Sequence, residues 1–214
     1  MKKLICTLVV LVPLLLPGDA LAQYGLHTRS GVGVGGEATL SSDASTYGAR
    51  AGYVLASDLE LGVTATRATP DSTTIDRTGV GPYVAFYPVL QQEGYPLSIV
   101  MTGDYNYHQF TDLPGGGTET GHSVRFGTGL FAAIQVSEAV RLVPFVGARF
   151  TRNSTAGILT NANERTSLNF RLPVQIAVSE AASVVVRPSV LVGDGGTTRY
   201  GASASLVFSL GGDD

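Results

Sequence analysis

Apolar and polar residues alternate with a period of two along most of this chain. The clearest stretches are residues 97–110, 166–178 and 199–210. Successive side chains of a β-strand point to opposite sides, so each stretch would have one apolar and one polar face. After residue 22 no segment keeps a helical period, and no apolar run is long enough for a membrane-spanning helix. The pattern predicts strands from end to end.

Turn signals divide this pattern into ten predicted strands. Short acidic turns recur at Ala56–Leu59, Val136–Ala139 and Val178–Ala181, with Gln91–Gly94 in the remaining gap. They alternate with longer polar loops at Ser41–Ser45, Pro70–Asp76, Thr111–Gly121, Asn153–Glu164 and Gly193–Thr197. The strands expected between them are 30–41, 46–56, 59–69, 77–88, 97–110, 122–136, 139–152, 165–178, 183–192 and 198–210. Tight turns at one end and long loops at the other predict an up-and-down meander.

Four prolines fall inside these predicted strands, namely Pro82, Pro144, Pro173 and Pro188. Proline lacks the N–H that a strand donates to its neighbour, so we expect a level of bulges or bends near the tight turns. If the prolines end strands instead, eight strands become the alternative to ten.

The polar faces of the predicted strands carry the charge. Their titratable residues are Glu37, Arg50, Glu60, Asp104, His108, Arg125, Arg141, Arg149, Arg171, Arg187 and Arg199. The opposite faces carry mostly aliphatic and aromatic residues, and ten such strips would form an apolar belt too large for water. Closing the sheet leaves no unpaired edge in hydrocarbon. We therefore predict an all-β fold, a closed antiparallel transmembrane β-barrel whose charged residues face the lumen.

Aromatic residues lie near both ends of the lipid-facing positions. Those near the long loops are Tyr47, Tyr105, Tyr107, Phe150 and Tyr200, and those near the tight turns are Phe86, Tyr95 and Phe208. Aromatic residues gather at the two interfaces of transmembrane barrels, so these eight residues are the predicted aromatic girdle.

Composition agrees with a barrel in lipid. Charged residues make up 14% of the 214 residues, and 27 residues are glycine, whereas soluble domains have about 25% charged residues and about 7% glycine. Small inward residues allow a narrow barrel to hold large inward side chains. The formal charge of −3 gives no basic surface for nucleic acid, which we exclude as a partner.

The first 22 residues have the form of a cleaved signal peptide. Two lysines precede an apolar run over 4–17, and a small-x-small pattern ends at Ala22. We predict a signal peptide at 1–22 and a barrel domain at 23–214. The one cysteine, Cys6, lies in the leader, so the mature chain would have no disulfide or thiol chemistry.

Several of these features occur together in one known family. They are the signal peptide, the tight Ser-Asp and Ser-Glu turns, the long opposite loops, a last alternating strand with Phe208, and the segment Gly52–Gly62. In these features the chain resembles the small outer-membrane β-barrel proteins of Gram-negative bacteria. The resemblance implies the bacterial outer membrane as location, its lipid as surroundings, and recognition of the C-terminal strand by the barrel-assembly machinery. We expect a monomer.

Residues for catalysis or metal binding are sparse. Asp104 and His108 share one strand face, and Asp112, Glu119 and His122 lie nearby in sequence. An Asp–His pair at the rim resembles the omptin-type outer-membrane proteases, but the further rim carboxylates of those longer proteins are not found. Three scattered histidines match no metal-ligand spacing. We therefore assign no catalytic residue, no metal and no cofactor.

The expected function follows from the barrel itself. We expect a structural or surface-interaction scaffold that presents polar extracellular loops. A narrow porin-like channel for small solutes is the first alternative, and a hydrolase at the rim is the second. Inward arginines paired with Glu37, Glu60 and Asp104 would fill much of the lumen.

Overall fold

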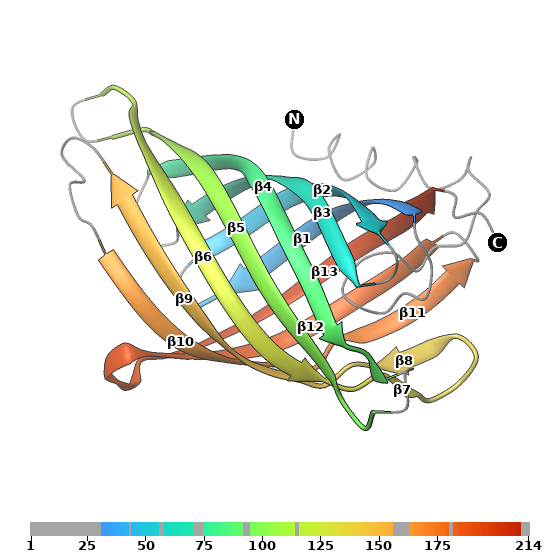
Figure 1. Ribbon diagram of the computed structural model, residues 1–214. Coiled ribbons are helices and arrows are strands. Elements are labelled where there is room, and N and C mark those ends of the chain that lie inside the picture. Colours follow the sequence, from blue (N-terminus) through green and yellow to red (C-terminus); the bar gives the residue numbers. More distant parts are fainter. Residues whose placement is uncertain are drawn as a thin grey trace.

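A computed structural model describes residues 31–42, 44–55, 58–70, 75–91, 95–113, 116–155, 163–179 and 182–210. The predicted signal peptide lies outside these residues. One antiparallel sheet curls round and closes on itself (Figure 1). Its strands are β1 (Gly31–Ser41), β2 (Ala44–Leu55), β3 (Leu59–Pro70), β4 (Asp76–Val89), β5 (Ser98–Thr111), β6 (Glu119–Phe131), β7 (Ile134–Gln135), β8 (Val140–Leu142), β9 (Phe145–Thr155), β10 (Asn163–Arg171), β11 (Val174–Ser179), β12 (Ala182–Gly193) and β13 (Thr198–Leu210). A short 3₁₀ turn, η4 (Asp194–Gly196), precedes β13.

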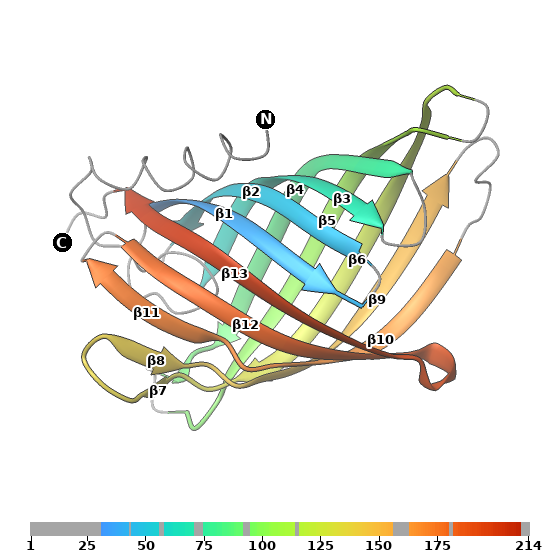
Figure 2. The same cartoon turned by 180° about the vertical axis from the view of Figure 1, so that it is seen from behind.

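The thirteen segments form a barrel of ten strands, as the sequence predicts. Strands β1 to β6 pair in chain order, β6 pairs with β9, β9 with β10, β10 with β12, β12 with β13, and β13 closes the barrel on β1. The short segments β7, β8 and β11 continue the lines of β6, β9 and β10 toward the tight turns (Figure 2). The alternative of eight strands is therefore wrong.

Prolines interrupt two of the ten strands without shifting them. Pro144 separates β8 from β9, and Pro173 separates β10 from β11. Pairing partners follow one unbroken register on both sides of each proline. Pro82 and Pro188 also leave the register unchanged, so the bulges expected at the four prolines are wrong, whereas the alternative of bends stays a prediction. The registers shift instead between Phe86 and Val89 and between Ala177 and Ser179.

The carbonyl oxygens of Pro144, Pro173 and Pro188 still accept backbone hydrogen bonds from the neighbouring strand. The N–H of Val143 donates to the Pro173 carbonyl oxygen at 2.8 Å, and that of Leu172 donates to Pro188 at 3.1 Å. The N–H of Ala132 donates to the Pro144 carbonyl at 3.2 Å. Proline has no N–H to return the second bond of such a pair, so each proline removes one bond and leaves the strand in place.

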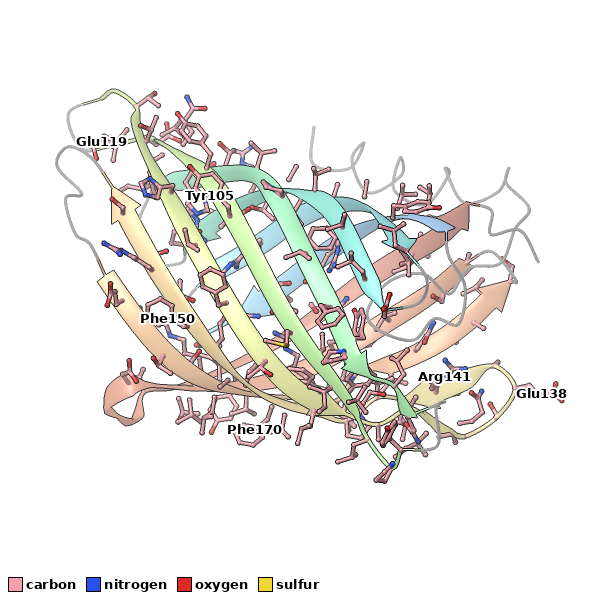
Figure 3. The ribbon with its side chains drawn as sticks, in the orientation of Figure 1. Tyr105, Glu119, Glu138, Arg141, Phe150 and Phe170 are labelled. Atoms are coloured by element: carbon pink, nitrogen blue, oxygen red, sulfur yellow. The ribbon has the colours of Figure 1, made fainter. Side chains whose placement is uncertain are left out.

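The two ends of the barrel differ as expected, with two corrections. The connections after β3, β5 and β9 have five, seven and seven residues, whereas those after β2, β7 and β11 at the opposite end have three, four and two. The connection after β4, Leu90–Leu97, has eight residues and is therefore longer than the tight turn expected at Gln91–Gly94. Glu119 and Glu138 mark the two ends in Figure 3. The first predicted loop, Ser41–Ser45, is instead a tight turn. There the N–H of Ala44 donates to the Ser41 hydroxyl at 3.2 Å, and that hydroxyl donates to the Ala44 carbonyl at 2.9 Å.

Strand tilt follows from the pairing registers. Following paired residues once around the barrel returns to β1 about 14 residues further along, which requires strongly tilted strands. The tilt is evident in Figure 1. No described helix has the length and apolar character needed to cross a membrane.

The outer surface of the barrel is apolar. Large hydrophobic side chains are exposed on every strand of the wall, from Val32 on β1 to Tyr200 on β13. Figure 3 shows Tyr105, Phe150 and Phe170 on the outside of β5, β9 and β10. This surface is stable in lipid and not in water, because exposed apolar area on this scale drives association.

The eight predicted girdle residues lie at outward positions or in a turn. Tyr95 lies in the connection between β4 and β5, and Phe208 is half-buried on β13. The other predicted residues keep exposed fractions of 38–66%, namely Tyr47, Phe86, Tyr105, Tyr107, Phe150 and Tyr200.

Candidate lumenal site

The barrel encloses a cavity of about 550 Å³ lined from all ten strands. Eight of the eleven titratable residues that the sequence assigns to the lumen line it, namely Glu37, Arg50, Asp104, His108, Arg125, Arg149, Arg171 and Arg187. Glu60 lies behind Arg50 in the wall and is 1% exposed. Arg141 lies on β8 near the tight turns, where its Nε donates to Gln135 at 3.0 Å. Arg199 is exposed near the other end of the barrel.

A buried carboxylate organises the wall formed by β2, β3 and β4. The Oε1 of Glu60 accepts bonds from Arg50 Nη2 at 2.9 Å and from the Tyr83 hydroxyl at 2.6 Å. The hydroxyl of Tyr87 donates to Oε2 at 3.4 Å. The Arg50 guanidinium also stacks over the Tyr83 ring, 3.7 Å from its centroid. A buried charge needs both a counter-charge and hydrogen bonds, and Glu60 has both.

Two glycines make the space that Tyr83 occupies. Gly52 and Gly62 face each other across β2 and β3. A Cβ on Gly62 would lie 2.5 Å from Cε1 and 2.6 Å from Cζ of Tyr83, and one on Gly52 would collide with the Tyr83 hydroxyl. The ring therefore lies flat against bare backbone, which leaves its other face for Arg50.

The same arrangement recurs on the β6–β9 wall. Gly129 and Gly147 face each other across the two strands, and the Phe145 ring occupies the space that their side chains would need. The Arg171 guanidinium lies over the other face of this ring, 5.2 Å from its centroid. An aromatic ring between a glycine pair and an arginine thus appears twice in one barrel.

Two further arginines are paired with acids in the lumen. The Nε of Arg125 donates to Asp104 Oδ1 at 2.6 Å, and the side-chain amide of Asn106 donates to the same oxygen at 2.7 Å. The Nη1 of Arg187 lies 3.3 Å from Glu37 Oε2. Together with the Arg50–Glu60 pair, these two ion pairs provide the expected pairing of inward arginines with Glu37, Glu60 and Asp104.

Arg77, Tyr83 and Asn106 also line the cavity but were not singled out from the sequence. Arg77 and Tyr83 lie on β4 an even number of residues apart, so the alternation of a strand places both side chains on the same face. The alternation along this strand could therefore have identified Arg77 and Tyr83 as inward residues.

Arg77 and Arg149 differ from the paired arginines. Within the described residues neither guanidinium has a hydrogen bond or a carboxylate within 4.0 Å. Six arginines line the cavity against two carboxylates, with Glu60 as a third acid beside them. The lumen therefore carries an excess of positive charge although the whole chain is formally negative.

A packed apolar cluster lies inside the barrel toward the tight turns. We call it the apolar plug, and it consists of Ala85, Tyr87, Leu90, Val100, Phe131 and Val143. These residues are 4–8% exposed. Tyr87 and Phe131 meet edge to face with ring centroids 6.3 Å apart. From the opposite wall, Val185 and Val207 are buried to 3% and 2% exposure.

Asp104 and His108 do not form an acid–base pair. Asp104 is bonded to Arg125 and Asn106, whereas His108 Nε2 lies 2.8 Å from the hydroxyl of Ser123. The other ring nitrogen, Nδ1, is buried without a partner in the described structure. A hydrolytic Ser–His pair needs an accessible hydroxyl, but Ser123 is 3% exposed. No group of three metal-ligating side chains occurs among the residues that the structure describes.

No protein-family model and no curated protein sequence matches this chain. An outer-membrane channel from Pseudomonas putida F1 is similar in structure, with a TM-score of 0.50 and 14% identity over 92% of this chain and 100% of that one. The N-terminal β-barrel domain of Pseudomonas aeruginosa OprF gives 0.39 and 10% over 86% and 100%. The KdgM porin gives 0.44 and 6% over 84% and 99%. At these identities the likeness concerns the fold, a closed barrel of the outer-membrane type.

Proposed function

We propose that this protein is an integral outer-membrane barrel that works as a scaffold for its polar loops and does not form an open pore. The apolar plug is the observation that supports this proposal. Its side chains are packed and buried, so water cannot pass between them without displacing apolar contacts. A monomer embedded in lipid fits the apolar outer surface, and its last strand would be the segment read by the barrel-assembly machinery.

Conductance in planar lipid bilayers tests the closed lumen directly. The wild-type barrel should give no stable single-channel openings. The double variant Phe131→Ala, Val143→Ala removes two plug side chains and should give openings, because the space left behind admits water and ions. Phe126→Ala is the matched control, since Phe126 lies on the same strand but is 58% exposed on the outer surface. Stable openings of the wild-type protein would contradict the scaffold proposal.

A narrow channel for small anions is the second candidate. The excess of arginine in the cavity lining favours it, because rings of arginine select for anions in pores. If the wild-type barrel conducts, the reversal potential across a potassium chloride gradient should have the sign of chloride selectivity.

We further propose that the rim carries no hydrolase. Asp104 is occupied by Arg125 and Asn106, and no carboxylate orients His108. A hydrolytic activity that disappears in His108→Ala would contradict this.

A further inference from the structure

Four arginines from adjacent parts of the wall face one side of the cavity. We call Arg77 on β4, Arg125 on β6, Arg149 on β9 and Arg171 on β10 the arginine cluster. Arg149 is close enough to Arg125 and Arg171 for direct Coulomb interaction, and Arg77 interacts in the same way with Arg125. Like charges are thus gathered in a space partly shielded from bulk water.

Two members of this cluster, Arg77 and Arg149, have no carboxylate within 4.0 Å among the residues that the structure describes. Asp104 is the carboxylate that interacts with Arg149, but its Oδ1 is already bonded to Arg125 and Asn106. Glu37 and Glu60 are held by Arg187 and Arg50. Confined positive charge without a counter-charge is unfavourable. In a purely structural core, Arg77 and Arg149 would need neutralising acids like those of Arg50, Arg125 and Arg187.

We propose that the arginine cluster is a binding site for a small anion with at least two carboxylate or phosphate groups. The planar guanidinium donates parallel hydrogen bonds that match both groups. A single charge would leave at least one of Arg77 and Arg149 unmatched. The cavity of about 550 Å³ is in the size range of small-molecule sites.

Access to the site rests on the proposed function, in which the plug closes the tight-turn end. The anion then enters and leaves from the long-loop end, where Arg77 lies one residue from the start of β4. Binding in this site goes beyond the proposed scaffold role and needs no transport across the membrane.

Isothermal titration calorimetry of the full barrel in detergent tests the proposal. Citrate and pyrophosphate are the probes for the two classes of anion, and acetate and chloride at equal ionic strength are the singly charged controls. We expect one site per barrel for citrate, pyrophosphate or both, and no saturable binding of acetate or chloride. Which probe binds decides between carboxylate and phosphate ligands.

Variants locate the site within the lumen. Arg77→Gln, Arg149→Gln should weaken binding of the probe by about tenfold or more, because each change removes charge-assisted hydrogen bonds. Arg152→Gln is the matched control on β9, since Arg152 is 62% exposed and paired with Glu164 outside the lumen. Heat-modifiable migration in detergent gels verifies that each variant is folded. Absence of saturable binding to the wild-type barrel would overturn the proposal. Equal binding by the double variant Arg77→Gln, Arg149→Gln and by the control Arg152→Gln would overturn it too. Conductance tests the scaffold role separately.

Discussion

Replacing Glu60 with glutamine should lower the free energy of unfolding by about 2–3 kcal/mol. Breaking a buried ion pair costs about 3–5 kcal/mol because one charge is left without its partner. The expected loss is smaller because the Arg50 side chain is 20% exposed to the cavity. Glutamine would also present an amide where Tyr83 and Tyr87 donate hydrogen bonds. Urea unfolding in lipid vesicles, followed by the gel shift of the folded barrel, measures the change.

Glu164→Gln is the matched control for Glu60→Gln. Glu164 pairs with Arg152 at 3.6 Å, and the two side chains are 58% and 62% exposed. Exposed pairs contribute about 0–1 kcal/mol, so this variant should unfold close to wild type. The double variant Arg50→Gln, Glu60→Gln removes both charges and should recover part of the lost stability. Equal losses in Glu60→Gln and Glu164→Gln would show that Glu60 does not organise the wall.

Placing a methyl group on Gly62 should cost about 2–3 kcal/mol, because overpacking forces side chains and backbone apart. The added Cβ would collide with the Ala51 carbonyl oxygen across the strand pair and lie 2.5 Å from the Tyr83 ring. A backbone carbonyl cannot move aside as the end of a flexible side chain can. The shift of Tyr83 would also weaken its hydrogen bond to Glu60. The urea midpoint of Gly62→Ala, read by the same gel shift, checks this.

Gly36→Ala provides the comparison for Gly62→Ala. A Cβ on Gly36 would have the Gly48 carbonyl oxygen as its nearest neighbour, at 3.9 Å, which is ordinary van der Waals contact. Alanine also reduces the freedom of the unfolded chain, so this variant should be neutral or more stable by up to about 1 kcal/mol. If both alanine variants unfold at the same urea concentration, the space beside Gly62 is not filled as described.

The sequence alone predicted the strands of the barrel closely, because alternation and turns are local signals. The last strand is an example, expected at 198–210 and found as Thr198–Leu210. The same alternation distinguished inward from outward residues. On one strand, an inward arginine and an outward aromatic residue are separated by an odd number of positions in the sequence. Arg149 and Phe150 on β9 are such neighbours, one lining the cavity and the other exposed outside.

The contents of the lumen were less predictable. Leu90 belongs to the plug because a register shift after Phe86 changes which residues point inward, and no alternation rule anticipates that shift. The ion-pair partner of each inward arginine could not be predicted from the sequence either, because an arginine such as Arg50 could reach several acids across a narrow lumen. Glycine spacing suggested a tight interior, but the fit of Tyr83 and Phe145 onto glycine pairs depends on registers between strands.

Stiffness cannot be uniform around this barrel. Pro144, Pro173 and Pro188 lie in three successive strands, and each removes one rung from the hydrogen-bond ladder of the same part of the wall. Under lateral pressure from the bilayer, the wall bends first where the backbone hydrogen bonds between strands are fewest. The cross-section should therefore flatten along one fixed direction, with β8 and β11 as the compliant side and the unbroken ladders of β1, β2 and β3 as the rigid one.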